Sequence, residues 1–235
     1  MDTHYPSEYT RGWVEFYYQK FQVNEYVLIP RFETEDLVRE TIKMAENTPF
    51  DTLIDVGTGS GIIPISILTK VAIEQSFGLD ISPKALEVAK TNAENIGVKN
   101  IEFLISDLLS IFLSPTSVTF GKNILITANL PYIKDGDWEN MSEDTQHEPK
   151  IALFGGSETG FELYEKLFIQ IPDFLEKHRP KRLTILTEMG EDQEEIATST
   201  LESLTQKLEE NGRKINFSFF ADCFGIRRFM KIEIL

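Results

Sequence analysis

Hydrophobic runs alternate with amphipathic stretches along most of the chain. Short apolar runs rich in β-branched residues predict buried strands, and apolar residues repeated every three or four positions predict helices. The strands are predicted at 52–57, 75–82, 101–106, 123–129, 182–190, 214–222 and 227–235, and the helices at 35–47, 61–70, 82–97, 163–177 and 193–212. Strands that alternate with helices are typical of an α/β protein with a mainly parallel sheet covered on both faces.

The last two predicted strands break this alternation, because only residues 223–226 separate them. Such a short link cannot hold a crossover helix, so the two strands must form an antiparallel hairpin. The sequence therefore predicts a mainly parallel seven-stranded sheet with helices on both faces and a C-terminal antiparallel hairpin. This outline resembles the Rossmann-like fold of class I methyltransferases.

Several helix ends carry local signals. Ser82 is predicted to cap its helix, with Pro83 at the first helical position and Gly97 as the stop. Thr34 is predicted to cap the helix that starts at Glu35, because its hydroxyl can accept a hydrogen bond from a free backbone N–H.

Residues 1–26 are mainly aromatic and polar and precede the alternating pattern. Trp13, Phe16, Tyr17 and Phe21 recur at helical spacing, which predicts a short amphipathic helix or an irregular aromatic arm packed on the domain. We therefore expect residues 1–26 to be a short N-terminal arm and residues 27–235 to be one larger domain.

Composition and charge limit the classes of function. The chain has 235 residues, of which 41% are hydrophobic, and a net charge of -15. An acidic surface repels phosphate backbones, so direct nucleic-acid binding is not expected. A single cysteine, Cys223, cannot form a disulfide framework or a cysteine-based zinc site, and we expect no metal. Without a visible signal peptide or an apolar run of membrane-spanning length, we expect a cytoplasmic protein that does not bind membranes.

A glycine-rich loop follows the first strand of the alternating pattern. Its candidate ligand-binding residues are Asp55, Gly57, Thr58, Gly59, Ser60 and Gly61. A dinucleotide fingerprint would require glycine at the position of Ile62, and Asp55 would repel a pyrophosphate. A nicotinamide dehydrogenase is therefore disfavoured. A carboxylate beside this loop would instead attract an ammonium or sulfonium group.

Two further carboxylates follow the next two strands. Asp80, at the end of the second, can accept hydrogen bonds from both hydroxyls of a ribose. Asp107, after the third, can hold an adenine edge through its carboxylate or the adjacent backbone, although it could also cap the following turn. A nucleoside pocket that favours positive charge fits S-adenosyl-L-methionine, so we expect this cofactor.

The fourth strand ends at Asn129 and is followed by Leu130, Pro131 and Tyr132, across from the expected sulfonium. An amide or aryl-amine nitrogen is a weak nucleophile, and two acceptors aimed at its N–H groups would orient it. The Asn129 side-chain oxygen and the Leu130 carbonyl can supply them, and Pro131 restricts Leu130 to an extended conformation. Tyr132 offers a flat face to a planar group. We expect these four residues to be catalytic, through positioning and electrostatics.

Five segments together resemble a known family. They are VLIPRFETEDLV (27–38), DVGTGSG (55–61), NLPYI (129–133), EPKIALFGGSETG (148–160) and EMGEDQ (188–193). The chain resembles the release factor glutamine methyltransferases, also called the HemK-like or PrmC-like group, from about Phe21 to its C-terminus. The usual helical N-terminal domain is not expected, because only 26 residues precede VLIPR.

The resemblance implies methyl transfer from S-adenosyl-L-methionine, which leaves S-adenosyl-L-homocysteine, to a protein. The acceptor would be the side-chain amide of the glutamine in the Gly-Gly-Gln motif of peptide chain release factors. The implied residues are Asn129, Leu130, Pro131 and Tyr132 at the substrate amide, Gly57 to Gly61, Asp80 and Leu108 around the cofactor, Arg31 and Glu33 in the pocket cover, and Glu148 and Pro149 at its rim. A release factor is thus the expected protein partner. The chain itself is expected to be a monomer.

Two alternatives stay open. Leu130 stands where the family has a proline, and Asn-Leu-Pro-Tyr also resembles adenine dimethyltransferases that act on ribosomal RNA. An adenine-amino methyltransferase acting on RNA or DNA should show a basic surface, which the charge of -15 disfavours. The second alternative is a non-catalytic methyltransferase-like partner subunit, which the intact glycine loop and Asn129 disfavour.

Overall fold

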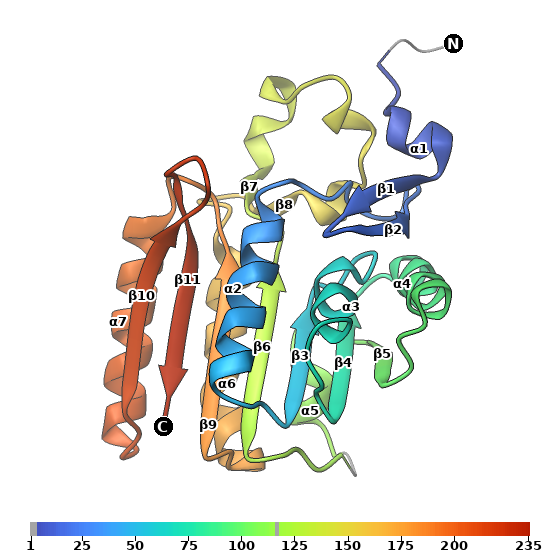
Figure 1. The fold of residues 1–235 in the computed structure, drawn as a ribbon. Coiled ribbons are helices and arrows are strands. Elements are labelled where there is room, and N and C mark those ends of the chain that lie inside the picture. Colours follow the sequence, from blue (N-terminus) through green and yellow to red (C-terminus); the bar gives the residue numbers. More distant parts are fainter. Residues whose placement is uncertain (1–3, 116–117) are drawn as a thin grey trace.

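The computed structural model describes residues 4–115 and 118–235. Its main sheet has seven strands in the order β10-β11-β9-β6-β3-β4-β5 (Figure 1). The strands are β3 (Thr52–Val56), β4 (Gln75–Asp80), β5 (Ile101–Ile105), β6 (Asn123–Asn129), β9 (Arg182–Glu188), β10 (Ile215–Ala221) and β11 (Arg227–Ile234). Strand β11 runs opposite to the other six strands of this sheet, and it is antiparallel to both of its neighbours, β9 and β10. The predicted mainly parallel seven-stranded sheet with a C-terminal antiparallel hairpin is confirmed.

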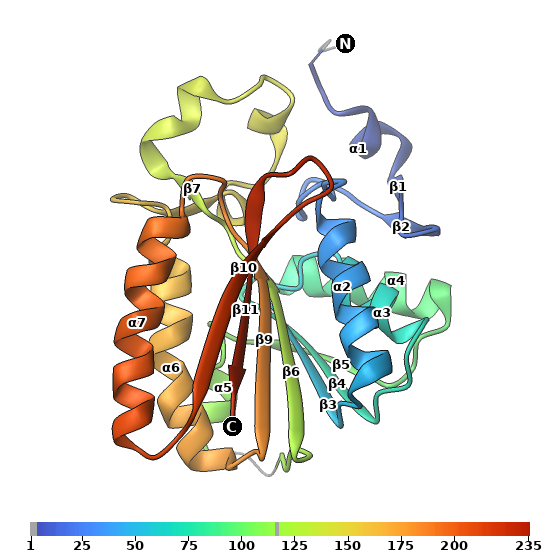
Figure 2. The same cartoon turned by 60° about the vertical axis from the view of Figure 1, so that its left-hand side comes forward.

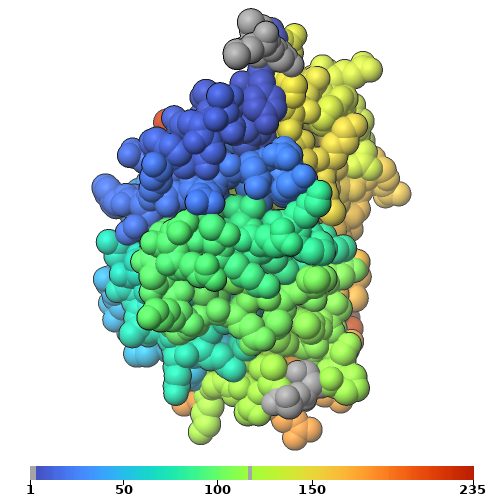
Figure 3. Space-filling model, turned by 90° about the vertical axis from the view of Figure 1, so that its right-hand side faces the viewer, coloured from blue at the N-terminus to red at the C-terminus, as the bar shows by residue number. Residues whose placement is uncertain are grey.

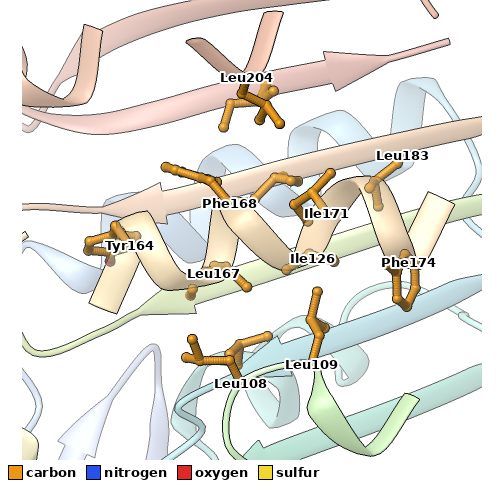
Figure 4. Packing of buried hydrophobic residues seen from close by; sticks show 14 of the residues in the cluster. Leu108, Leu109, Ile126, Tyr164, Leu167, Phe168, Ile171, Phe174, Leu183 and Leu204 are labelled. Atoms are coloured by element: carbon orange, nitrogen blue, oxygen red, sulfur yellow. The ribbon is translucent and has the colours of Figure 1, made fainter. Parts of the chain in front are cut away.

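Helices cover both faces of this sheet (Figure 2). One face carries α2 (Thr34–Asn47), α3 (Ile62–Leu68) and α4 (Pro83–Ile96), and the other carries α5 (Ser110–Leu113), α6 (Glu162–His178) and α7 (Glu194–Glu210). Successive β3 side chains point to opposite faces, so Leu53 joins the first core and Ile54 the second. Figure 4 shows the second core, where α6 packs its apolar side against the strands.

The helix ends follow their sequence signals with one exception. The Ser82 hydroxyl accepts a hydrogen bond from the Ala85 N–H at 3.2 Å, and Gly97 ends α4 in the left-handed conformation, as predicted. The predicted cap at Thr34 is wrong. Thr34 lies inside α2, and its hydroxyl donates instead to Glu188, 2.8 Å away on another element.

The N-terminal segment forms a helix and a hairpin, α1 (Ser7–Arg11), β1 (Trp13–Phe16) and β2 (Gln19–Gln22). The helical or irregular conformation predicted for Trp13 to Phe21 is therefore wrong, whereas the predicted packing of this segment on the domain is observed. Tyr17 and Tyr18 adopt φ values of 44° and 63° and reverse the chain, so that Phe16 and Phe21 are buried together. Residues 1–3 of the predicted arm lie outside the described residues, and the boundary at residue 27 stays a prediction.

Asn92 of α4 fastens this hairpin to the main domain. Its Oδ1 accepts from the Gln22 N–H at 2.6 Å, and its Nδ2 donates to the Gln22 carbonyl at 3.0 Å and to the Ser60 carbonyl at 2.9 Å. The space-filling view shows the N-terminal segment, in blue, directly against the green surface of the domain (Figure 3). The hairpin and the glycine loop thus share one anchoring side chain.

A long insertion follows β6 at the carboxyl end of the sheet. It contains β7 (Ile133–Lys134), the 3₁₀ helices η1 (Asp135–Asn140), η2 (Thr145–His147) and η3 (Lys150–Ala152), and β8 (Phe154–Gly156). The strands β7 and β8 form a separate parallel pair. In the part of the chain that the structure describes, no helix is both long and apolar enough to cross a bilayer.

Candidate active site

A cavity of about 450 Å³ opens at the carboxyl ends of the central strands. It is of the size that takes a drug-sized molecule. The predicted site residues that line it are Arg31, Gly57, Thr58, Gly59, Ser60, Asp80, Asp107, Leu108, Asn129, Leu130 and Pro131. The predicted residues that do not line it are Glu33, Asp55, Gly61, Tyr132, Glu148 and Pro149. Most of the cofactor and acceptor residues expected from the sequence therefore meet in one space.

The glycine loop and the Asn-Leu-Pro-Tyr loop face each other across this cavity, because β3 and β6 are neighbours. Gly57 has a φ of 71°, which side-chain-bearing residues rarely adopt. A Cβ atom there would lie only 2.8 Å from Leu130 Cδ2. Glycine at position 57 is thus required both by the turn and by the close approach of the opposite loop.

Asp80 supports the glycine loop from the end of β4. Its Oδ2 accepts from the Gly59 N–H and its Oδ1 from the Ser82 N–H, both at 2.8 Å. Burial raises the pKa of Asp80 above its ordinary value, against the effect of these hydrogen bonds. Each oxygen keeps a further lone pair, so the carboxylate can still accept hydrogen bonds from hydroxyls of a molecule in the cavity.

Asp55 lies beneath the loop rather than on the cavity wall. It is fully buried, and its Oδ1 accepts from the Thr127 hydroxyl at 2.6 Å. Burial raises the pKa of Asp55 to about 7. Within the described residues, Asp55 Oδ2 and Thr58 Oγ1 are buried without a hydrogen-bond partner. Because Asp55 does not line the cavity, its cofactor role stays a prediction.

Asp107 and Leu108 form the far wall of the cavity. The Asp107 carboxylate pairs with the Lys166 ammonium, and both side chains are about half exposed. Leu108 has a φ of 53°, and its carbonyl accepts from the Ser106 hydroxyl at 2.7 Å. Because the Asp107 carboxylate already has a cationic partner, backbone groups of this turn are better placed to bind a base edge.

The cover and rim residues are joined by an ion pair between a buried Glu148 and a partly exposed Arg31. Glu148 is 4% exposed and accepts from the Arg31 guanidinium and from the Ile29 N–H, the latter at 2.8 Å. Burial raises the pKa of Glu148, although Arg31 opposes this shift. Glu33 directly precedes α2, and Pro149 directly precedes η3. The pair therefore ties the segment before α2 to the insertion after β6.

Asn129 is oriented by contacts behind the cavity wall. Its Nδ2 donates to Thr34 Oγ1 and to Glu188 Oε2, each at 3.1 Å. The Leu130 N–H donates to the Tyr164 hydroxyl at 3.0 Å. The Asn129 side-chain amide and the Leu130 backbone N–H are thus both held by residues behind the cavity wall.

Four of the residues that hold this loop were not predicted as site residues. They are Thr34, Tyr164, Glu188 and Gln193. Glu188 and Gln193 lie in the segment EMGEDQ, which contributed to the family resemblance but received no role. No sequence signal identified Glu188, because it meets Asn129 through the register of β6 and β9, which depends on the folded sheet.

Comparisons with known proteins agree with this geometry. A family model described as a methyltransferase domain matches residues 48–124. The release factor glutamine methyltransferase of Enterococcus faecalis is 35% identical over 89% of this chain and 73% of its own length. The release factor glutamine methyltransferase of Lactococcus lactis is 35% identical over 97% of this chain and 77% of its own length. That of Bacillus cereus is 37% identical over 80% of this chain and 65% of its own length. The matches thus cover 65% to 77% of the length of these three relatives.

Solved structures resemble the fold at low sequence identity. A ribosomal protein L11 methylase from Lactobacillus delbrueckii has a TM-score of 0.51 at 22% identity, with 87% of this chain and 79% of that chain covered. The N-terminal domain of human METTL16 in complex with SAH has a TM-score of 0.56 at 15% identity, with 91% and 74% covered. At these identities the likeness concerns the fold alone.

Proposed function

Since the chain belongs to the release factor glutamine methyltransferase family, we propose that it methylates the glutamine side chain of the Gly-Gly-Gln motif in peptide chain release factors. The family resemblance of the sequence is confirmed by these relatives. The chain is an S-adenosyl-L-methionine-dependent methyltransferase of class I. The acceptor and the role of each residue are the substance of the proposal.

The cavity suits the cofactor in size and in chemistry. Asp80 offers carboxylate oxygens for the ribose hydroxyls, and the Leu108 turn offers an apolar surface with adjacent backbone groups for the base. Gly57 to Ser60 let the backbone approach the amino-acid end without side-chain clashes. When bound, S-adenosyl-L-methionine supplies an electrophilic methyl group, and the acceptor nitrogen releases one proton to solvent.

The acceptor amide would lie at Asn129 and Leu130. An amide nitrogen has a delocalised lone pair, so it reacts only when its geometry and its electron density are favourable. The Asn129 Oδ1 and the Leu130 carbonyl would accept its two N–H groups and orient the lone pair. Pro131 keeps Leu130 extended. Tyr132 would pack its ring against the substrate backbone at the edge of this site.

The contact between Gly57 and Leu130 carries the proposal. The two loops that would hold the donor and the acceptor lie close together where they leave their strands, since a Cβ at Gly57 would lie 2.8 Å from Leu130 Cδ2. A methyl group and a nitrogen held by these loops would therefore be close enough to react. Separate pockets for the two substrates would not permit direct transfer.

The test is to incubate the protein with methyl-labelled S-adenosyl-L-methionine and a purified release factor, and then to locate the label by mass spectrometry. The label should lie on the glutamine of the Gly-Gly-Gln motif. A release factor with alanine at that position is the matched control and should stay unlabelled. Asn129→Ala should bind the cofactor in calorimetry but lose most of the transfer. Full transfer by that variant would contradict the acceptor role of Asn129.

One feature favours a second acceptor and belongs in the same experiment. Leu130 makes the tetrapeptide similar to that of adenine dimethyltransferases, so ribosomal RNA should be offered in a parallel reaction. The charge of -15 predicts that RNA will stay unlabelled. Label on RNA adenines and none on the release factor would replace the proposed acceptor.

A further inference from the structure

The strand ends of β6 and β9 bring a buried carboxylate behind Asn129. Asn129 and Glu188 are register partners in the parallel pair, and Glu188 is 1% exposed. Glu188 Oε2 accepts from the Thr34 hydroxyl at 2.8 Å and from Asn129 Nδ2 at 3.1 Å. Thr34 Oγ1 in turn accepts from the same Nδ2 at 3.1 Å. These three side chains therefore form a closed hydrogen-bonded group.

This group decides which end of the Asn129 amide faces the cavity. The oxygen and nitrogen of an asparagine amide are nearly equal in shape, so only their hydrogen-bond partners distinguish the two orientations. An ionised carboxylate accepts hydrogen bonds and cannot donate one. Glu188 therefore attracts Nδ2 inward, and Oδ1 is left on the cavity side, where Asn129 lines the wall.

We propose that Glu188, together with Thr34, is a positioning residue that holds Asn129 with its side-chain oxygen toward the acceptor nitrogen. The inference rests on the proposed function, because it explains how Asn129 becomes an acceptor for the substrate amide. Glu188 itself touches neither the cavity nor the reacting atoms.

The neighbouring backbone is fixed from the same segment. The Tyr164 hydroxyl donates to the Glu188 carbonyl and accepts from the Leu130 N–H at 3.0 Å. The Gln193 Nε2 donates to the Tyr132 carbonyl at 3.0 Å, while its Oε1 accepts from the Gly190 N–H at 2.9 Å. Residues 188–193 thus support the tetrapeptide at its first, second and fourth positions.

The protonation state of Glu188 should affect this arrangement. The charged and titratable groups that face it come from several elements, and they are Arg228 on β11, Arg31 and Glu33 before α2, Tyr132 after β6 and Tyr164 on α6. Burial dominates over these groups and raises the pKa of Glu188 to about 7. A protonated Glu188 can donate to Asn129 Oδ1 and turn the amide, so kcat should rise with pH through about 7.

The decisive variant is Glu188→Gln, which keeps the shape and introduces a donor. Its amide would donate to Asn129 Oδ1 and draw the oxygen inward. We expect kcat to fall about 100-fold, as for other losses of transition-state alignment. The cofactor Kd and the KM for the release factor should stay within about twofold, and the acid limb of the kcat profile should disappear. Glu202→Gln, on the exposed side of α7, is the matched control and should behave as the wild type.

A reciprocal variant separates positioning from a structural role. In Asn129→Asp/Glu188→Gln, the introduced amide can donate to one oxygen of the introduced carboxylate and leave the other oxygen for the substrate. We expect the double variant to recover at least about tenfold over Glu188→Gln, because the acceptor direction is restored. Thr34→Ser should keep activity, whereas Thr34→Val should lose it. Unchanged kcat in Glu188→Gln, or no recovery in the double variant, would overturn the inference.

A readout without any acceptor keeps the two proposals distinct. The side-chain amide signals of Asn129 in asparagine-labelled protein should shift with pH near 7 in the wild type and stay constant in Glu188→Gln. Constant wild-type signals would overturn the inference. A wild-type protein that methylates no release factor would refute the proposed function instead, and the titration would still decide how Asn129 is held.

Discussion

The contact between the two loops leads to a quantitative prediction for Gly57→Ala. The backbone of the new alanine must adopt a φ of 71°. Its methyl group would lie 2.8 Å from Leu130 Cδ2, well inside normal contact distance. The left-handed conformation costs an L-residue about 1–2 kcal/mol. Relief of the clash requires Leu130, which is 3% exposed and packed in the core, to move by several tenths of an ångström or more.

Because Leu130 is buried, its side chain has little room to turn aside, so we expect part of the shift to reach its backbone and the carbonyl that is proposed to bind the acceptor. A displacement of about 1 Å at a reacting centre can cost about 100-fold in rate. We therefore expect Gly57→Ala to lose about 1–2 kcal/mol of stability, from the backbone term alone, and about 100-fold in kcat. Thermal unfolding and steady-state methylation of the release factor measure the two effects.

Gly97→Ala is the matched control for the backbone term. Gly97 has a φ of 88°, but a Cβ there would meet nothing within 4 Å. It should lose a similar amount of stability and keep its kcat. The variant Gly57→Ala/Leu130→Ala removes the clashing Cδ2 and should be faster than Gly57→Ala alone. Equal kcat values for Gly57→Ala and Gly97→Ala would show that the reasoning about loop proximity is wrong.

Three further changes test other parts of the site and its support. Asp80→Ala should raise the cofactor Kd in calorimetry by about 100-fold or more, because two charge-assisted hydrogen bonds to the ribose would be lost; an unchanged Kd would remove Asp80 from the pocket. The raised pKa of Asp55, about 7 against 3.8, means that the folded state binds more protons between these values, so its contribution to stability falls as pH rises. Asp55→Asn should remove this loss, about 3 kcal/mol between pH 5 and pH 8, in urea unfolding at these two pH values, and an identical pH response in both proteins would contradict it. Asn92→Ala deletes hydrogen bonds to Gln22 and Ser60 and should cost about 2–3 kcal/mol, with faster hydrogen exchange over residues 13–22 than in the wild type; unaltered exchange would refute its anchoring role.

Local signals explain why most elements could be predicted from the sequence. Ser82, Pro83 and Gly97 act within one helix, and their effect does not depend on the rest of the fold. The N-terminal hairpin was not predicted, because the spacing of its aromatic residues suits a helix as well as two strands. Its turn uses Tyr17 and Tyr18 at positive φ instead of the usual glycine or asparagine, so no turn residue revealed it.

In the candidate site, too, some residues could be predicted from the sequence and others could not. Asp80 and Asn129 could be predicted because side chains at the carboxyl ends of parallel strands meet at one edge of the sheet. The partners of Asn129 could not, because they depend on strand register and on the placement of α2. The cap signal at Thr34 was even misleading, since its hydroxyl is bound to Glu188.

The reversed direction of β11 has a consequence for how this architecture can diversify. Because β11 runs against its neighbours, the tip of the β10–β11 hairpin lies at the same edge of the sheet as the candidate-site loops, where the Cys223 N–H donates to Asp36 of α2 at 2.8 Å. This tip can lengthen, shorten or change its side chains without altering the register of any inner strand. The hairpin tip is thus a segment beside the candidate site whose length and side chains are independent of the pairing of the inner strands.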